Sequence, residues 1–136
     1  MVGYSDTPLP RKLGIKEGHR VALLRVPAGF ERVLGPLPGG VDITTRAQGP
    51  IDVAVAFFTR SRELERRFAT LKRALSSDGG LWIAWPKRAS GLETDLTEGV
   101  VREVALANGL VDNKVCAIDA TWSGLRLVYR LTDRPR

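Results

Sequence analysis

An aromatic ring and two cations come together near residue 85. Trp85 ends an apolar run, and Lys87 and Arg88 follow it after one proline. An indole ring offers a flat amphipathic surface, and Lys and Arg donate hydrogen bonds to phosphate or carboxylate groups. Ligand-binding residues concentrate on loops of this kind. The trio predicts a binding site for a small anionic ligand; the alternative is that Trp85 packs in the core while the two cations are only solvated.

Other side chains that carry chemistry are sparse. His19 is the only histidine and Cys116 the only cysteine, so the sequence lacks both a zinc ligand set and a histidine-centred triad. Cys116 lies in an apolar run and is predicted to be a small core residue, not a reactive thiolate. The triplet Asp112-Asn113-Lys114 has the composition of a turn. We therefore predict no catalytic residues, no metal and no cofactor.

The length of the chain and its single cysteine limit the class of protein to which it can belong. The chain of 136 residues suits one α/β domain, predicted over 1–131, followed by a basic tail over 132–136. A lone cysteine forms no internal disulfide, and no stretch approaches the ~18 apolar residues of a membrane span. We expect a cytoplasmic protein with no membrane partner.

The net charge of +6 raises the question of whether the protein binds nucleic acid. The densest basic run is interleaved with acids, and Glu63 and Arg67 have the i,i+4 spacing of a helical ion pair. This pattern is typical of a solvated helix face, and a phosphate-binding face is the alternative. The basic residues of the run are Arg60, Arg62, Arg66, Arg67, Lys72 and Arg73.

Apolar periodicity predicts the elements that must position these residues. A helix over 8–13, capped by Ser5-Asp6-Thr7-Pro8, is followed by a buried strand over 20–26 and a short helix within 28–35. A weak strand over 41–47 and a buried strand over 51–58 come next. A helix capped by Ser61 is predicted to end at Asp78-Gly79-Gly80, before a strand over 81–85. Asp95 and Glu98 have capping-box spacing for a further helix, and strands over 114–119 and 124–131 end the chain.

The joints between these elements predict the topology. Strand, helix and strand with short joints form a βαβ unit with parallel strands. The link 120–123 is too short for a parallel crossover, so the last two strands form an antiparallel hairpin. The joint after 41–47 is equally short, so this segment either pairs antiparallel with 51–58 or is an extended edge segment outside the full sheet, which we favour. The fold class is α/β, a three-layer Rossmann-like domain whose free sheet edge would permit a homodimer.

Ligands of open parallel sheets bind outside the carboxyl ends of the strands. Three groups of residues follow predicted strand ends in this sequence, and we predict that they line the binding site together. They are Pro27, Gly29 and Phe30; Thr59 and Arg60; and Trp85, Lys87 and Arg88.

Two resemblances accompany this pattern. LKRALSSDGGLWI (71–83) and LGIKEGHRV (13–21) are similar to the leads into two central strands of class I S-adenosylmethionine-dependent methyltransferases. The segments 3–24, 85–103 and 109–128 resemble a bacterial family of small Rossmann-like proteins of unknown function, over nearly the whole chain. Both resemblances imply a Rossmann-like fold, and the second resemblance brings no established activity with it.

The first resemblance also implies a cofactor site, which needs several glycines after the first strand and an acid at the end of the second. Here the turn 25–29 has one glycine, and the second strand ends in Thr45-Arg46, with Asp42 at its beginning. We therefore favour a noncatalytic module that binds a small anionic ligand or a protein partner. The alternatives are a methyltransferase-like enzyme with a rebuilt cofactor pocket and nucleic-acid binding through the Arg-rich surface.

Overall fold

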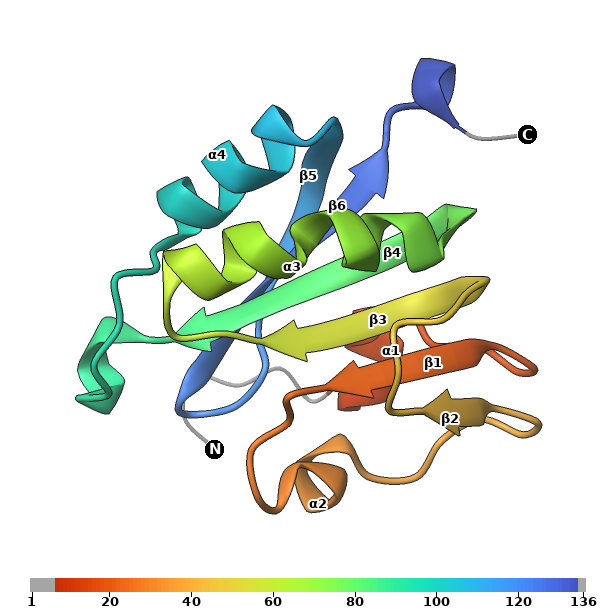
Figure 1. The fold of residues 1–136 in the computed structure, drawn as a ribbon. Helices are drawn as coiled ribbons and strands as arrows, with labels where there is room; N and C mark the ends of the chain where they lie inside the picture. The colour runs from red at the N-terminus through yellow and green to blue at the C-terminus, as the bar shows by residue number, and fades with distance from the viewer. Residues whose placement is uncertain (1–6, 135–136) are drawn as a thin grey trace.

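The computed structural model describes residues 7–134, which form a six-stranded sheet in the order β2-β1-β3-β4-β6-β5 with helices on both faces (Figure 1). The four strands β2, β1, β3 and β4 are parallel, and β6 runs antiparallel to both β4 and β5. The predicted fold class and the C-terminal hairpin are confirmed. The elements are α1 (Leu9–Leu13), β1 (Arg20–Leu24), α2 (Phe30–Leu34), β2 (Asp42–Thr44), β3 (Ile51–Phe57), α3 (Ser61–Ala74), β4 (Leu75–Pro86), α4 (Glu98–Ala107), β5 (Leu110–Ala117) and β6 (Trp122–Tyr129), with 3-10 turns at Arg88–Ser90 and Leu131–Asp133.

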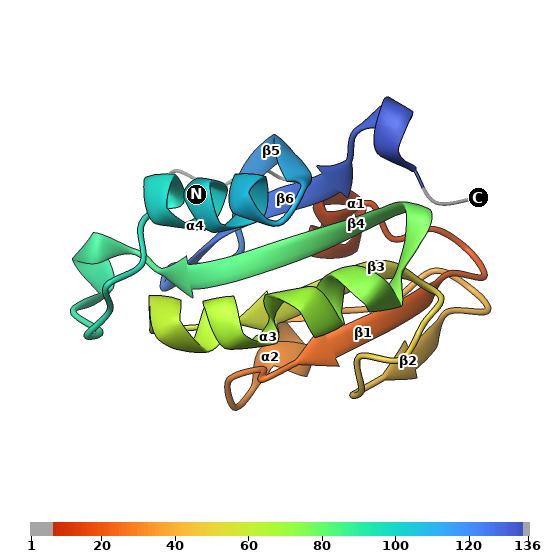
Figure 2. The same ribbon diagram turned by 45° about the horizontal axis from the view of Figure 1, so that its top comes forward.

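The sheet is the middle of three layers. The helices α3 and α4 cover one face, while α1 and α2 lie on the other (Figure 2). Successive residues of β1 alternate between the two apolar clusters, because Val21 and Leu23 face α1 and α2 whereas Ala22 and Leu24 face α3. A strand buried on both faces gives the unbroken apolar run seen in the sequence.

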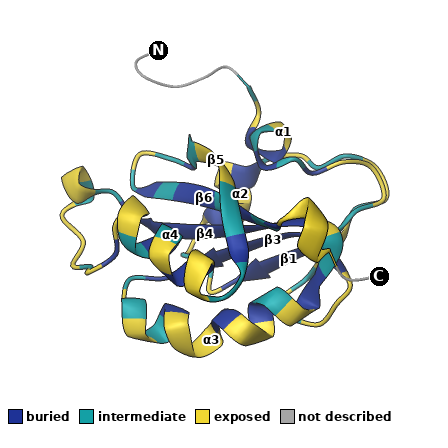
Figure 3. Cartoon of the chain, turned by 90° about the horizontal axis from the view of Figure 1, so that it is seen from above, coloured by how far each residue is buried: buried dark blue, intermediate teal, exposed yellow. Residues whose placement is uncertain are grey.

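Helix α3 is amphipathic, as predicted. Leu64, Phe68 and Leu71 are buried against the sheet, and the opposite face of the helix is exposed (Figure 3). The helix ends at Ala74, so the predicted stop at Asp78-Gly79-Gly80 is wrong. The chain becomes extended at Leu75, which pairs with Ile51 of β3 and stays in the core. β4 therefore begins earlier than the glycines suggest.

The segment over 41–47 is a true member of the sheet. Its residues Asp42–Thr44 form β2, which pairs in parallel with β1 at the edge of the sheet. The prediction that this segment stays outside the full sheet is wrong, because it assumed that β2 and β3 are neighbours. β1 lies between them, and the crossover from β1 to β2 runs through α2 with ample length.

The C-terminal hairpin also differs from the expected boundaries. β5 begins at Leu110, so Asp112-Asn113-Lys114 is not a turn but part of a strand, with a bulge between Asp112 and Lys114. The carboxylate of Asp112 accepts from Arg102 Nε of α4 at 3.1 Å, which joins this strand to the helix. Among residues 7–134, no helix is long and apolar enough to cross a lipid bilayer. Ser5, Asp6 and residues 135–136 lie outside the described part of the chain.

Candidate functional site

The connections leaving β1 and β3 diverge. β1 leads through α2 to β2 at one edge of the sheet, and β3 leads through α3 to β4 on the other side. In open α/β sheets the ligand crevice lies outside the carboxyl ends of two neighbouring strands whose connections leave in opposite directions. The candidate site is therefore the region between Leu24, the last residue of β1, and Phe57, the last residue of β3.

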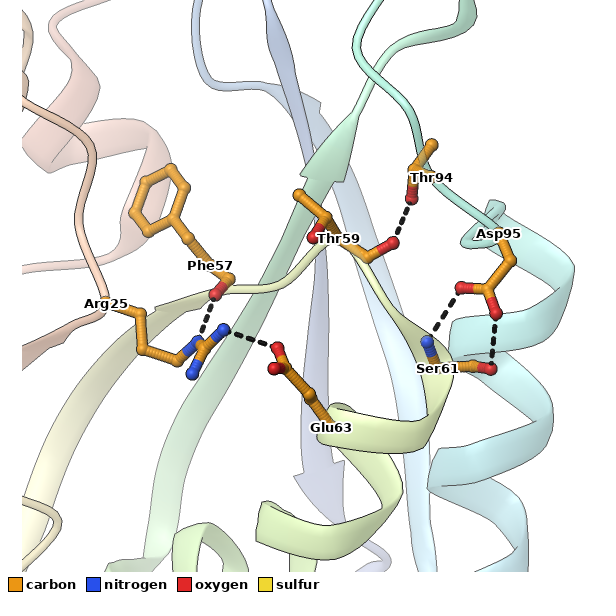
Figure 4. Close-up of polar contacts among 7 residues, drawn as sticks. All are labelled: Arg25, Phe57, Thr59, Ser61, Glu63, Thr94 and Asp95. Carbon is orange, nitrogen blue, oxygen red and sulfur yellow. Dashed lines mark hydrogen bonds and ion pairs between the residues drawn. The ribbon is translucent and has the colours of Figure 1, made fainter.

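Arg25 spans this crevice. Its Nε donates to the carbonyl of Phe57 at 3.0 Å, and its Nη2 lies 2.6 Å from Oε2 of Glu63 (Figure 4). The guanidinium carbon also lies 4.8 Å from the centre of the Phe58 ring, within the range of a cation–π contact. We call this set of contacts the Arg25 bridge. The predicted pair between Glu63 and Arg67 is not formed, because Glu63 binds Arg25 instead.

The Arg25 bridge combines backbone strain with a replaceable ion pair. Arg25 is the one described non-glycine residue with a left-handed backbone, at φ 57°, a conformation that costs an L-residue about 1–2 kcal/mol. Its side chain is 42% exposed and that of Glu63 43%, and such half-exposed pairs contribute only about 0–1 kcal/mol. An incoming carboxylate can therefore replace Glu63 at the guanidinium at little cost.

Aromatic packing holds the turn after β1 against β3. The rings of Phe30 and Trp122 each contact Phe57 edge to face, with ring centroids 5.0 Å apart. Phe30, which was predicted to line the site, is 2% exposed and belongs to the core. Gly29 adopts φ 83°, which favours glycine, and the carbonyl of Pro27 accepts from Phe30 N at 3.2 Å. Pro27, Gly29 and Phe30 thus shape the turn that presents Arg25.

Beside this turn lies a pocket of about 170 Å³ between α2 and β2, which we call the α2 pocket. Most of its wall is apolar, and its two polar side chains are Glu31 of α2 and Thr45 after β2. The carboxylate of Glu31 has no hydrogen-bond or ion-pair partner among the described residues. Glu31 thus places an unpaired carboxylate in the same pocket wall as Thr45, which follows β2. The lining residues are Leu23, Val26, Glu31, Leu34, Gly35, Leu37, Ile43 and Thr45.

A second pocket of about 350 Å³ lies at the end of β4, and we call it the rim pocket. Trp85 is almost fully buried in the core and still forms part of the wall, together with Arg88. Lys87 is not a lining residue; its backbone N–H donates to the carbonyl of Thr121 at 2.7 Å. Arg60 pairs with Glu93 at 3.7 Å. The lining residues are Trp85, Pro86, Arg88, Leu92, Thr94, Leu96, Thr97 and Glu98.

The loop that forms the rim pocket is tied to the end of β3. The carbonyl of Thr59 accepts from Thr94 Oγ1 at 2.6 Å and from Asp95 N at 3.3 Å (Figure 4). The carboxylate of Asp95 accepts from Ser61 N at 2.8 Å and from Ser61 Oγ at 3.0 Å. The backbone N–H of Ser61 is the largest cause of a lowered pKa at Asp95. Asp95 therefore caps α3.

The capping box predicted for Asp95 and Glu98 is wrong. α4 begins at Glu98, and its cap is Thr97, whose Oγ1 accepts from Val100 N at 3.2 Å. Asp95 is too far from the helix start to serve it, and the loop turns its carboxylate toward α3 instead.

All eight predicted site residues lie at the carboxyl edge, but they do not line one site. Pro27, Gly29 and Phe30 form the turn after β1, and of the other five only Trp85 and Arg88 line the rim pocket. Thr59, Arg60 and Lys87 contact the neighbouring loops instead. Sequence reasoning missed Arg25, Glu31 and Glu63. Arg25 had one available signal, since it directly follows a strand where the cofactor-binding turn needs glycine. Glu63 had none, because 38 positions separate it from Arg25.

Neither a protein-family model nor a curated protein sequence matches this chain. Solved structures do match. An S-adenosylmethionine-dependent methyltransferase from Aquifex aeolicus has a TM-score of 0.61 at 16% identity, covering 86% of this chain and 85% of that one. A putative type 11 methyltransferase from Sulfolobus solfataricus has a TM-score of 0.59 at 13% identity, covering 94% and 93%. Magnesium protoporphyrin IX methyltransferase from Synechocystis, with bound SAH, has a TM-score of 0.58 at 14% identity, covering 84% and 75%.

These likenesses confirm the Rossmann-like, methyltransferase-like fold. They also correct the leading functional prediction, a noncatalytic module binding a small anionic ligand or a protein partner. That prediction is wrong, because the similar structures are methyltransferases and favour the methyltransferase alternative. It rested on the position of the rim residues outside the strand ends and on the absence of a metal set, a histidine-centred triad and a phosphate loop in the sequence, and the missing glycines and acid weighed against the methyltransferase alternative. Arg25 and Glu31 nevertheless place polar groups at the same edge of the sheet.

Proposed function

We propose that this chain is a methyltransferase-like protein that binds S-adenosylmethionine in a rebuilt pocket at the carboxyl ends of β1, β2 and β3. The observation that carries the proposal is the Arg25 bridge. It is a half-exposed guanidinium, held in a strained backbone, at the point of the sheet where ligands of this fold bind.

The amino-acid half of the cofactor fits the Arg25 bridge. A guanidinium binds a carboxylate through two parallel hydrogen bonds. The Phe57 carbonyl holds Nε of Arg25 in place, which leaves Nη1 and Nη2 for the ligand once Glu63 is displaced. Glu63, once displaced from the guanidinium, is an acceptor for the ammonium group of the same ligand. The two residues together complement the zwitterion that a glycine-rich turn would otherwise receive through its backbone.

The nucleoside half fits the α2 pocket. Its volume of about 170 Å³ is below the ~300 Å³ at which pockets for drug-sized ligands begin, so it accepts a flat ring rather than the whole cofactor. Glu31 is an acceptor for ribose hydroxyls, a role that an acid at the end of the second strand has in the dinucleotide-binding folds. Thr45 adds a hydroxyl on the facing wall.

The rim pocket is the proposed site of the methyl acceptor. When bound, S-adenosylmethionine supplies an electrophilic methyl group on its sulfonium sulfur. Arg88, Thr94 and Glu98 orient an acceptor in the pocket through hydrogen bonds, and the buried face of Trp85 excludes water. Correct placement of two reactants is itself a large part of the catalysis of a bimolecular step.

Isothermal titration of the purified protein with S-adenosylhomocysteine tests the proposal. We expect Arg25→Ala and Glu31→Gln each to weaken binding about tenfold, the size of one lost charge-assisted hydrogen bond. Arg66→Ala and Glu65→Gln remove the same charges from the exposed face of α3 and should leave the affinity unchanged. Absence of binding to the wild-type protein at millimolar concentration would overturn the proposal.

Nucleic-acid binding stays a second candidate because of one observation. Arg62, Arg66, Arg67 and Arg73 are exposed on α3 and form no ion pair with any described residue. Phosphate contacts release counterions, so an affinity for short duplexes carried by these residues must fall steeply as salt rises. A flat salt response would exclude this candidate.

A further inference from the structure

Another pocket lies at the opposite, amino-terminal edge of the parallel strands. It has a volume of about 250 Å³ and is formed by the turn before β1, the start of β3, the start of β4 and one residue of β6. We call it the amino-edge pocket. Its lining residues are Gly14, Lys16, His19, Asp52, Val53, Asp78 and Arg126.

Opposite charges line the amino-edge pocket without pairing. Lys16 and Arg126 form no ion pair with any described residue. Asp52 accepts the backbone N–H of Arg20 at 2.8 Å, and Asp78 lies 3.4 Å from the hydroxyl of Ser76. Two cations and two carboxylates thus share one cavity, and each keeps hydrogen-bonding capacity that the protein itself does not use.

Arg126 is the most informative of these groups. Its side chain is half-buried, and burial lowers the pKa of its guanidinium. The guanidinium packs on the backbone of Gly80, where an added Cβ would lie 2.7 Å from Cζ of Arg126 and closer still to Nε. Gly80 therefore makes room for a cation that has no counter-charge. Such a group gains most from a bound anion, because a desolvated charge without a partner is costly.

His19 adds a hydrogen-bond donor to the same cavity. Its Nδ1 accepts the backbone N–H of Lys16 at 3.1 Å. In the neutral imidazole the proton is then on Nε2, which is free to donate to a ligand.

We propose that the amino-edge pocket binds a small zwitterion of the α-amino acid class, with its carboxylate on Arg126 and its ammonium group on Asp52 and Asp78. A simple anion would satisfy Arg126 but meet two carboxylates, and a simple cation would meet Arg126 and Lys16. A ligand that carries both charges pairs with the cations of the pocket and with its carboxylates at the same time. This site lies at the other edge of the sheet from the proposed cofactor pocket and does not depend on it.

Calorimetric titration of the full chain with each of the common L-amino acids tests the site. We expect binding of at least one amino acid. Its deaminated acid and its decarboxylated amine should each bind at least about tenfold more weakly, because each loses one charge-assisted interaction. Asp78→Asn and Arg126→Lys should weaken binding about tenfold, whereas Asp133→Asn and Arg66→Lys, matched changes outside the pocket, should not.

Two further variants separate this site from the cofactor pocket. Arg25→Ala should retain amino-acid binding, and Arg126→Lys should retain any binding of S-adenosylhomocysteine. Asp78 is exposed, and among the described residues its carboxylate has one hydrogen-bond partner, Ser76, so Asp78→Asn tests the site without disturbing the fold. The proposal is overturned if no amino acid binds at millimolar concentration, if the deaminated acid binds as tightly as the amino acid, or if Asp78→Asn and Arg126→Lys both leave binding unchanged.

Discussion

The guanidinium of Arg25 and the carboxylate of Glu63 lie 2.6 Å apart, joining the turn after β1 to the first turn of α3. This ion pair and the strained backbone of Arg25 act in opposite directions on stability. The pair contributes about 0–1 kcal/mol, and the left-handed conformation costs about 1–2 kcal/mol.

Arg25→Gly and Arg25→Ala separate these two effects. Both substitutions remove the ion pair, but only glycine relieves the backbone strain at φ 57°. We expect the glycine variant to be more stable than the alanine variant by about 1 kcal/mol in urea unfolding. Equal stability of the two variants would show that the backbone at position 25 relaxes without glycine.

Asp95→Asn tests the cap of α3 and its dependence on pH. The pKa of Asp95 is lowered, first by the N–H of Ser61, so its folded form holds the charge more strongly than the unfolded chain. The stabilisation from this charge is fully present above the unfolded value near 3.8 and is lost as the pH falls through the lower folded value. We expect the variant to melt below the wild type at pH 6. The difference should narrow below pH 4, and a difference independent of pH would contradict this account.

Gly80→Ala tests the close approach of Arg126. The new Cβ overlaps the guanidinium, so we expect a loss of about 1–3 kcal/mol, typical of overpacking. In an Arg126→Ala background the same change should cost almost nothing, since the obstructing group is absent. Urea unfolding of the four proteins gives the coupling free energy directly. Additive effects would mean that Arg126 moves away from Gly80 freely.

Cys116 provides a test of burial on the hairpin. It is half-buried, and burial is the main cause of the raised pKa of its thiol. The thiolate is the reactive form, so we expect iodoacetamide at pH 8 to alkylate the folded protein several-fold more slowly than the urea-unfolded protein. Equal rates would indicate that Cys116 is open to solvent.

The sequence predicts the layers of this fold well because they depend on local periodicity. The run from Val21 to Leu24 is apolar at every position, a pattern typical of a central strand that is covered on both faces. The hairpin was predicted because the link expected over 120–123 is too short for a parallel crossover; in the structure the two strands are joined by the equally short link 118–121.

Contacts between distant segments were not accessible in this way. Asp95 has the spacing of a local cap, yet its carboxylate binds Ser61, 34 positions away, because the end of β3 holds its loop. Gly80 has the composition of a helix stop, yet its lack of a Cβ accommodates Arg126 from another strand. In both cases a residue type with a common local use serves a tertiary contact that only the assembled sheet creates.

The position of β2 at the edge of the sheet has a consequence for local unfolding. β2 is three residues long, pairs on one side only, and leaves Ile43 39% exposed. Backbone amides in such a segment open without global unfolding and exchange with solvent deuterium far sooner than those of β3. Since Ile43 and Thr45 line the α2 pocket, slower amide exchange in this one segment would report an occupied pocket.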